Sequence, residues 1–322
     1  MAAWFEKREL RRFSRVAMPI RLFITPEKPI INLEIFALGI DYFPQSIKNK
    51  IKRNRKQLIY WLDHIQEQKD ILYPVFMQII DAAETLGRSV EMISQGRSPL
   101  NDERLHQKIH LNIRTIKLIS SLEEPAPRTY NFLFEMEKKL THFFRLLFIS
   151  LHKSTPQKYH AFEPENRDFK IDEMTQKFSQ PSYQKIPLIQ AIYFMNELVT
   201  NYCDVFQEIN FDYYSLENPK AWKKTQVNIS AGGIAALYPK RFLSGKPLKS
   251  KMYFDGHDRV VEVKTAFARA ESHSSMGAEL NAFYFEFPHP QDQVFLELEI
   301  EKYQLDKVNS YCLNHQFLAS FN

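Results

Sequence analysis

Glycine is distributed very unevenly along the 322-residue chain, and this limits what the chain can fold into. There are eight glycines, but only Gly87 and Gly96 fall between residues 40 and 231, and five follow residue 231. Glycine marks turns and is unfavourable inside helices. We therefore expect the middle of the chain to be helical and the last third to be rich in turns and strands.

The middle segment carries apolar residues at helical spacing. They follow one another at intervals of mostly four and three, a heptad pattern kept over about five repeats: Leu58, Leu62, Ile65, Leu72, Phe76, Ile79, Ala83, Leu86, Val90 and Ile93. Pro74 interrupts the pattern and is predicted to kink or split the helix. Two interpretations stay open. The stripe faces the core of a helical bundle, which is the commoner case, or it forms an oligomerising coiled coil, which the strict period favours.

The rest of the chain divides into further helices and strands. Helices are predicted after a cap at Asn101 or Asp102, running to about residue 122, and at 128–152 and 187–209, with a long linker over 153–185. Two strands are predicted within residues 17–43. Five short strands separated by turn residues indicate an antiparallel barrel or sandwich, with the strands at 225–230, 234–239, 249–254, 260–268 and 278–287. A closing helix is predicted at 292–308.

Composition excludes several classes of protein. The net charge of +5, from 43 basic and 38 acidic residues, permits an anionic ligand without requiring nucleic acid. Cys203 and Cys312 are the two cysteines, so neither a disulfide framework nor a cysteine-based zinc site is expected. No apolar run is long enough to span a membrane, and because the N-terminal residues contain no apolar core, a signal peptide is not expected. A reducing cytoplasm is the expected location.

A cluster of arginines directly precedes the first predicted strand. Arg11 and Arg15 are four residues apart, and Arg12 is adjacent. Guanidinium groups bind phosphate and the edge of guanine through paired hydrogen bonds, and they stack on bases. The cluster is therefore a candidate site for a phosphorylated guanine ligand, although four arginines by themselves, including Arg8, are more often a solvated basic tail.

A second candidate lies between two of the later strands. Asn228 and Ser230 are two residues apart, so their side chains emerge on one face of a strand. Gly232 and Gly233 follow, and paired glycines let a ligand approach the backbone closely. Taken alone, this segment is more often a plain hairpin turn.

Together, the two segments resemble the motifs of the PilZ domain family. That family carries RxxxR, which Arg11 and Arg15 match, and (D/N)xSxxG, which Asn228, Ser230 and Gly233 match. The resemblance covers residues 1–43 and 215–322. It implies a six-stranded barrel that binds the bacterial second messenger cyclic di-GMP, with the arginines on phosphate and guanine and Asn228 and Ser230 on a guanine edge or phosphate. Arg12 would add charge without a motif of its own.

Other possible sites are weaker. His106 and His110 are four residues apart on a predicted helix, but no third ligand is apparent, so no metal site is expected. Six basic residues fall within residues 48–56 with no acidic one between them. This run is more often a solvated helix face than a patch for nucleic acid or lipid headgroups. No nucleotide-binding loop or hydrolase motif occurs, so no enzymatic activity or cofactor is expected.

These observations lead to one interpretation of the whole chain. We expect an α+β protein in which a helical bundle or coiled coil at 44–214 splits a PilZ-like antiparallel barrel formed by residues 1–43 and 215–322. Its expected function is to bind cyclic di-GMP and to pass the signal to a protein partner or a homo-oligomer through the helical segment. The alternatives are a degenerate PilZ scaffold that binds no nucleotide and a nucleic-acid-binding regulator that uses the basic run.

Overall fold

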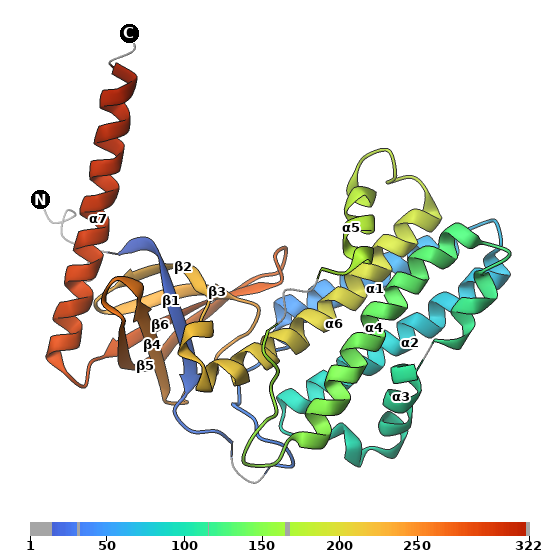
Figure 1. Ribbon diagram of the computed structural model, residues 1–322, viewed down its shortest axis with the longest axis horizontal. Helices are drawn as coiled ribbons and strands as arrows, with labels where there is room; N and C mark the ends of the chain where they lie inside the picture. Colours follow the sequence, from blue (N-terminus) through green and yellow to red (C-terminus); the bar gives the residue numbers. More distant parts are fainter. Residues whose placement is uncertain (1–14, 31–32, 115, 165–167, 320–322) are drawn as a thin grey trace, which may run out of the picture.

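The computed structural model describes residues 15–30, 33–114, 116–164 and 168–319. A β-barrel occupies the centre of the molecule and a body of helices lies on one side of it (Figure 1). A long final helix, α7, stands on the other side. Among the described residues, none of the helices has both the length and the apolarity needed to cross a membrane.

The barrel is closed and consists of six antiparallel strands. Their order around the barrel is β1-β2-β3-β6-β5-β4, and their bounds are β1 Val16–Pro26, β2 Lys224–Ser230, β3 Gly233–Tyr238, β4 Leu248–Phe254, β5 Arg259–His273 and β6 Ala278–Glu286. Alternate residues point into the barrel, so Val227 and Ile229 of β2 are buried while Asn228 between them is exposed. The predicted antiparallel barrel is confirmed, and so are its five later strands.

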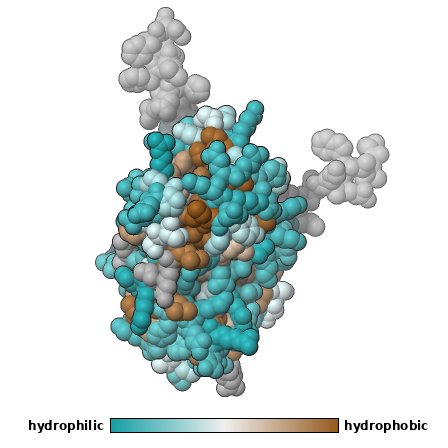
Figure 2. Space-filling model, turned by 90° about the vertical axis from the view of Figure 1, so that its right-hand side faces the viewer, coloured by the Kyte–Doolittle hydropathy of each residue, from teal (hydrophilic) through white to brown (hydrophobic). Residues whose placement is uncertain are grey.

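In the described part of the chain, six α-helices lie between β1 and β2, yet these two strands pair directly with each other. The helices are α1 Gln45–Asp63, α2 Lys69–Ser94, α3 Glu103–Arg114, α4 Pro127–Lys153, α5 Lys170–Gln176 and α6 Pro187–Glu217. Seen from its outer end, the helical body has a mainly hydrophilic surface with separate apolar groups (Figure 2). The division of the chain into independent domains stays a prediction.

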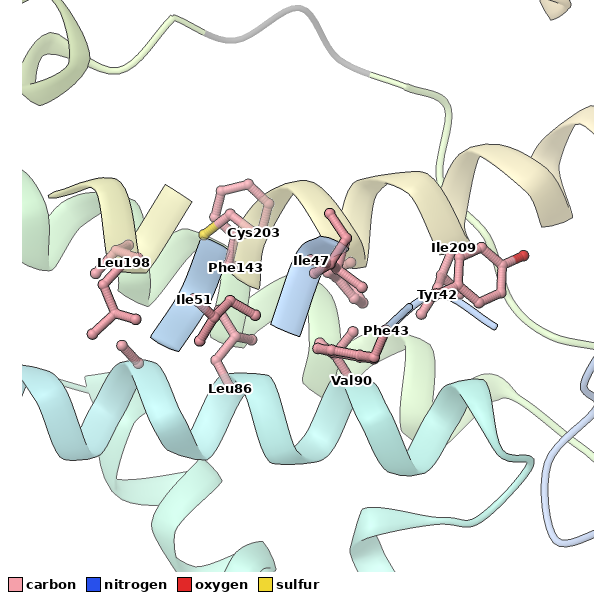
Figure 3. Packing of buried hydrophobic residues seen from close by; sticks show 14 of the residues in the cluster. Tyr42, Phe43, Ile47, Ile51, Leu86, Val90, Phe143, Leu198, Cys203 and Ile209 are labelled. Carbon is pink, nitrogen blue, oxygen red and sulfur yellow. The ribbon is translucent and has the colours of Figure 1, made fainter. Parts of the chain in front are cut away.

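The apolar stripe predicted over residues 58–93 is divided between α1 and α2. The helix is not split at Pro74, which lies inside α2. The chain breaks earlier, where Gln68 adopts a left-handed backbone conformation with φ of 55°. All ten residues of the stripe are buried. They pack inside the chain against α6 and neighbouring helices (Figure 3), so the stripe forms a bundle core and offers no free seam to another chain.

Close packing in this core depends on Gly87 of α2. A β-carbon at this position would collide with the ring of Tyr202 on α6. The absence of a side chain therefore lets the two helices approach each other here. In the same core, Leu86 and Val90 face Ile51 and other residues of α1, α4 and α6 (Figure 3).

The prediction of a second strand before residue 43 was wrong. Residues 33–44 form no strand and make only two isolated bridges, Ile30 with Ala37 and Asp41 with Arg241. Gly39 has a positive φ of 74°, which interrupts an extended strand. Successive residues within this segment, whose side chains point to opposite sides, are buried. The apolar run therefore packs between the barrel and the helices instead of pairing in the sheet.

The remaining helices differ from the prediction mainly in their ends. Asp102 is the predicted cap, and its carboxylate accepts a hydrogen bond of 3.1 Å from the backbone N–H of Leu105. The helix that follows ends at Arg114, and residues 117–122 form a separate 3-10 helix. The predicted linker at 153–185 contains α5, and α6 continues eight residues beyond the predicted end at 209. The closing helix is confirmed as α7, Pro290–Ala319, which is longer than predicted.

Candidate functional site

The last residue of the first predicted motif, Arg15, lies at the end of the barrel that carries the second motif. Arg11 and Arg12 lie outside the described residues. Arg15 is half-buried and directly precedes β1. Because Val16 pairs with Ile229 in an antiparallel register, Arg15 lies next to Ser230 on the neighbouring strand. The structure thus brings together residues that the sequence separates by the whole helical body.

The turn between β2 and β3 has the local geometry expected of its residues. Asn228 and Ser230 lie on the face of β2 opposite to the inward-pointing Val227 and Ile229, and on this face Asn228 is exposed while Ser230 is buried. The hydroxyl of Ser230 donates a hydrogen bond of 3.4 Å to the carbonyl oxygen of Gly233 and so closes the turn. A β-carbon on Gly233 would collide with the carbonyl oxygen of Phe283 on β6. Glycine is therefore needed here for the strands to pair.

Small residues surround Asn228 on the outer face of the barrel. Asn228 pairs with Ala17 of β1 on one side and with Ala235 of β3 on the other, and Ala235 in turn pairs with Ala282 of β6. The exposed amide of Asn228 consequently lies beside a floor of small side chains, of which Ala235 and Ala282 are buried. Neighbouring side chains therefore cover part of this floor, and Ala17 and Asn228 are its exposed members.

Two residues at the edge of this floor were not predicted from the sequence. Arg269 of β5 pairs with Ala282, and its side chain is 65% exposed, with its Nε 3.1 Å from a carboxylate oxygen of Glu271. Tyr284 of β6 pairs with Gly233 and is 61% exposed. Both reach the site because β6 pairs with β3. No sequence signal gives that strand order, although Tyr284 belongs to the predicted strand 278–287.

An open groove begins beside Tyr284 but is a weaker candidate for an anion. It has a volume of about 600 Å³ and lies along β4, β5 and β6. Its lining includes Lys246 and Lys264 but also Glu27 and Glu286. The opposite charges balance, so the groove does not favour a ligand with two phosphates.

A cluster of ionisable groups with perturbed pKa values lies away from this outer face, where the barrel meets the helices. Lys240 follows β3 and is buried, and its Nζ lies 2.8 Å from Glu208 and 2.5 Å from Asp212, both on α6. Tyr42 donates a hydrogen bond of 2.6 Å to Asp212. Burial raises the pKa of Asp212 to about 6, although Lys240 acts in the opposite direction. This cluster is a joint between barrel and helical body.

A second joint connects the β5–β6 hairpin to the start of α1. The helix begins after Pro44 without a side-chain cap of its own. The buried carboxylate of Glu279 on β6 accepts a hydrogen bond of 3.3 Å from the backbone N–H of Ser46, and Ser272 donates to the same carboxylate at 2.9 and 3.0 Å. A negative charge at a helix N-terminus is stabilising. The barrel therefore supplies the cap of α1.

The other sequence candidates are placed as follows. The rings of His106 and His110 on α3 are 4.8 Å apart, and His152 of α4 lies 6.4 Å from His106. Within the described part of the chain, no group of three or more His, Cys, Asp or Glu residues is arranged to hold a metal ion. In the basic run on α1, Arg55 forms an ion pair of 2.6 Å with Glu84.

Comparisons with protein-family models, with curated proteins and with solved structures find no match to this chain. The argument for a function therefore depends on the barrel and on the residues that meet at its outer face.

Proposed function

We propose that the chain is a receptor for cyclic di-GMP, similar to the PilZ domains that its motifs resemble. The register that pairs Val16 with Ile229 carries the proposal, because it puts Arg15 beside Ser230. If the two motifs occurred in the sequence by chance, nothing would require their residues to be neighbours in the fold. The closed six-stranded antiparallel barrel followed by a helix agrees with the fold that the resemblance implies.

The ligand lies on the outer face of the β2–β3 hairpin in this proposal. Arg15, with Arg11 and Arg12, binds phosphate and guanine, because guanidinium groups pair with both. Asn228 and Ser230 form hydrogen bonds with a guanine edge or a phosphate. Two features of the structure add to the motifs: Arg269, whose guanidinium pairs with Glu271, offers a further hydrogen-bond donor at the edge of the floor, and Tyr284 offers an exposed ring on which a base can stack.

The signal reaches the helical body along β3. Gly233 begins this strand at the ligand site, and Lys240, two residues after its end, forms ion pairs with α6. A change in the position of β3 alters the geometry of this buried cluster, which both parts share. In this proposal, the protein partner that receives the signal contacts the helical body. The proposed compartment is the cytoplasm.

Calorimetric titration with cyclic di-GMP tests the proposal. We expect the wild-type chain to bind and Arg15→Ala to weaken the affinity by roughly 5- to 150-fold, because one paired arginine contact contributes about 1–3 kcal/mol. Arg104→Ala, at an exposed arginine of α3, is the matched control and should bind normally. Arg269→Ala should lose less affinity than Arg15→Ala, since it makes a contact at the edge of the floor.

The outcomes separate the proposal from its alternatives. If the wild-type chain does not bind cyclic di-GMP, the alternative of a degenerate PilZ scaffold is favoured. Binding that survives Arg15→Ala unchanged contradicts the proposed site. DNA binding that weakens steeply with salt and needs no dinucleotide favours the basic run instead, where Lys48, Lys52 and Lys56 are exposed along α1.

Asn228 gives a second test of the same site. A carboxylate accepts hydrogen bonds from both N1–H and N2–H of guanine, whereas an amide offers one acceptor oxygen and turns a donor towards a donor. We expect Asn228→Asp to keep or tighten binding and Ser230→Ala to weaken it modestly. A clear loss of affinity in a folded Asn228→Asp variant would place a phosphate, not a guanine edge, at this position, because like charges repel.

A further inference from the structure

Helix α7 has two apolar faces, and the described part of the chain covers only one of them. Leu296 and Ile300 are buried against the barrel. On the opposite side of the helix, four apolar residues are exposed by 54 to 64%: Val294, Leu298, Leu305 and Val308. A helix that only covers the barrel would carry polar residues on this outer face.

The start of α7 is fixed to the barrel, whereas its continuation is not covered. Arg259 donates a hydrogen bond of 2.7 Å to Asp292, and the ring of Phe295 packs against Phe254 at 5.1 Å. From Leu305 to Ser310 every residue is exposed, and the helix stands clear of the barrel in Figure 1. Among the described residues, none packs over this part of α7. Helical segments without tertiary packing are marginal in water, so a contact with a partner would stabilise it.

The exposed stripe has the spacing of a coiled-coil seam. Its residues follow at intervals of four and three when Glu301 is included, and the same spacing continues in the sequence to Cys312. Residues at this period stay on one side of a supercoiled helix. Glu301 is the one charged residue in the seam between Val294 and Val308.

We infer that α7 pairs with α7 of a second copy of this chain to form a parallel two-stranded coiled coil. Charge favours a copy as the partner. Glu297 and Lys302 flank the seam five residues apart, and this is the spacing at which a parallel pair brings Glu297 of one copy to Lys302 of the other. The pairing occurs twice by symmetry. The buried faces with Leu296 and Ile300 point away from the seam, so the two barrels remain on the outside.

The helical body is a poorer candidate for this assembly. Its heptad stripe, which includes Ile79, is buried within the chain. The apolar side chains at its outer end form separate groups among hydrophilic ones (Figure 2). The continuous exposed stripe of α7 is thus the better seam.

Sedimentation velocity over a range of concentrations tests for the dimer. We expect a wild-type dimer whose dissociation constant rises by roughly 100-fold in Leu305→Asp, because that variant buries two unpaired carboxylates in the seam. Ser310→Asp adds the same charge on another side of α7 and should leave the dimer intact. Glu301→Leu should tighten it. A monomeric wild type, or a dimer unaffected by Leu305→Asp, overturns the inference.

Oxidative cross-linking tests the parallel orientation. A disulfide requires Cα atoms within about 7 Å, which facing seam positions of a parallel pair satisfy and an antiparallel pair does not. Cys203 is buried, and burial raises the pKa of its thiol, so it stays unreactive. We expect mild oxidation to give a covalent dimer that Cys203→Ser retains and Cys312→Ser abolishes. A dimer that cannot be cross-linked contradicts the parallel arrangement.

Discussion

Helices α2 and α7 carry apolar residues at the same heptad spacing, but they use them differently. The stripe on α2 is buried beneath α6 and its neighbours, with Ile79 and Leu86 fully covered. The stripe on α7 is more than half exposed at Leu298 and Leu305. The difference shows that heptad spacing specifies a face that needs a partner, while the surrounding fold decides whether the same chain provides it.

The largest effect is expected where the chain itself covers the stripe. Ile79→Asp combined with Leu86→Asp puts two unpaired carboxylates into the core of the helical body, at a cost of roughly 3–5 kcal/mol each. That total approaches the whole stability of a typical domain, so we expect the helical body to unfold. Circular dichroism with urea titration measures this.

Leu111→Asp is the control for that variant, because Leu111 of α3 is 62% exposed and its replacement should change the stability little. A folded double variant with the stability of the wild type would show that the stripe on α2 is not a core face.

The second-largest effect is expected at the buried ion-pair cluster that joins the helical body to the barrel. Lys240→Met leaves Asp212 and Glu208 buried without their cation, and we expect a loss of roughly 3–5 kcal/mol near pH 8. Burial already raises the pKa of Asp212 from 3.8 to about 6, and Lys240 lowers that of Glu208. Removing Lys240 moves both pKa values up.

The pH dependence of that variant has a definite sign. A carboxyl group whose pKa is higher in the folded state binds more protons when folded, so stability is lost as the pH rises through the interval between the two values. The variant should therefore differ least from the wild type near pH 4 and most above pH 6, measured by urea unfolding at each pH. The control variant Lys224→Met, at an exposed position of β2, should have the same stability as the wild type at both pH values. A constant loss across the range would mean that the carboxylates are not the cause.

The smallest effect is expected for the stripe that the chain leaves open. Leu305→Asp should change the free energy of unfolding by less than about 0.5 kcal/mol, because the side chain is 64% exposed. The measurement belongs at low protein concentration, where mass action leaves few dimers. A large loss of stability in the monomer would mean that the stripe of α7 is covered within one chain, and the contrast with α2 would disappear.

Much of the secondary structure could be predicted from local patterns. The five later strands, the Asp102 cap and the closing helix follow from alternation, helical spacing and turn residues, which act over a few neighbours. The second strand predicted before residue 43 is absent from the described residues. Its prediction depended on alternation of apolar and polar residues, whereas both faces of this segment are buried. The break between α1 and α2 was missed, since it depends on the left-handed backbone of Gln68.

For the candidate site, the sequence indicated the residue types but not all of their neighbours. The motifs singled out Arg15, Asn228 and Ser230. The approach of Arg269 and Tyr284 follows from β6 lying between β3 and β5. Strand order is set by how the whole barrel closes, which no local pattern records.

By itself, the sequence determined where most helices and strands form, which of their faces are apolar and which residues are candidates for binding a phosphorylated guanine ligand. These properties follow from local propensity and side-chain chemistry. The tertiary structure decided that β1 pairs with β2 across the intervening helices, that the stripe on α2 is covered and that the stripe on α7 is open. The physical reason is that burial of an apolar face depends on segments distant in the sequence, because closing the barrel and packing α6 on α2 are non-local contacts.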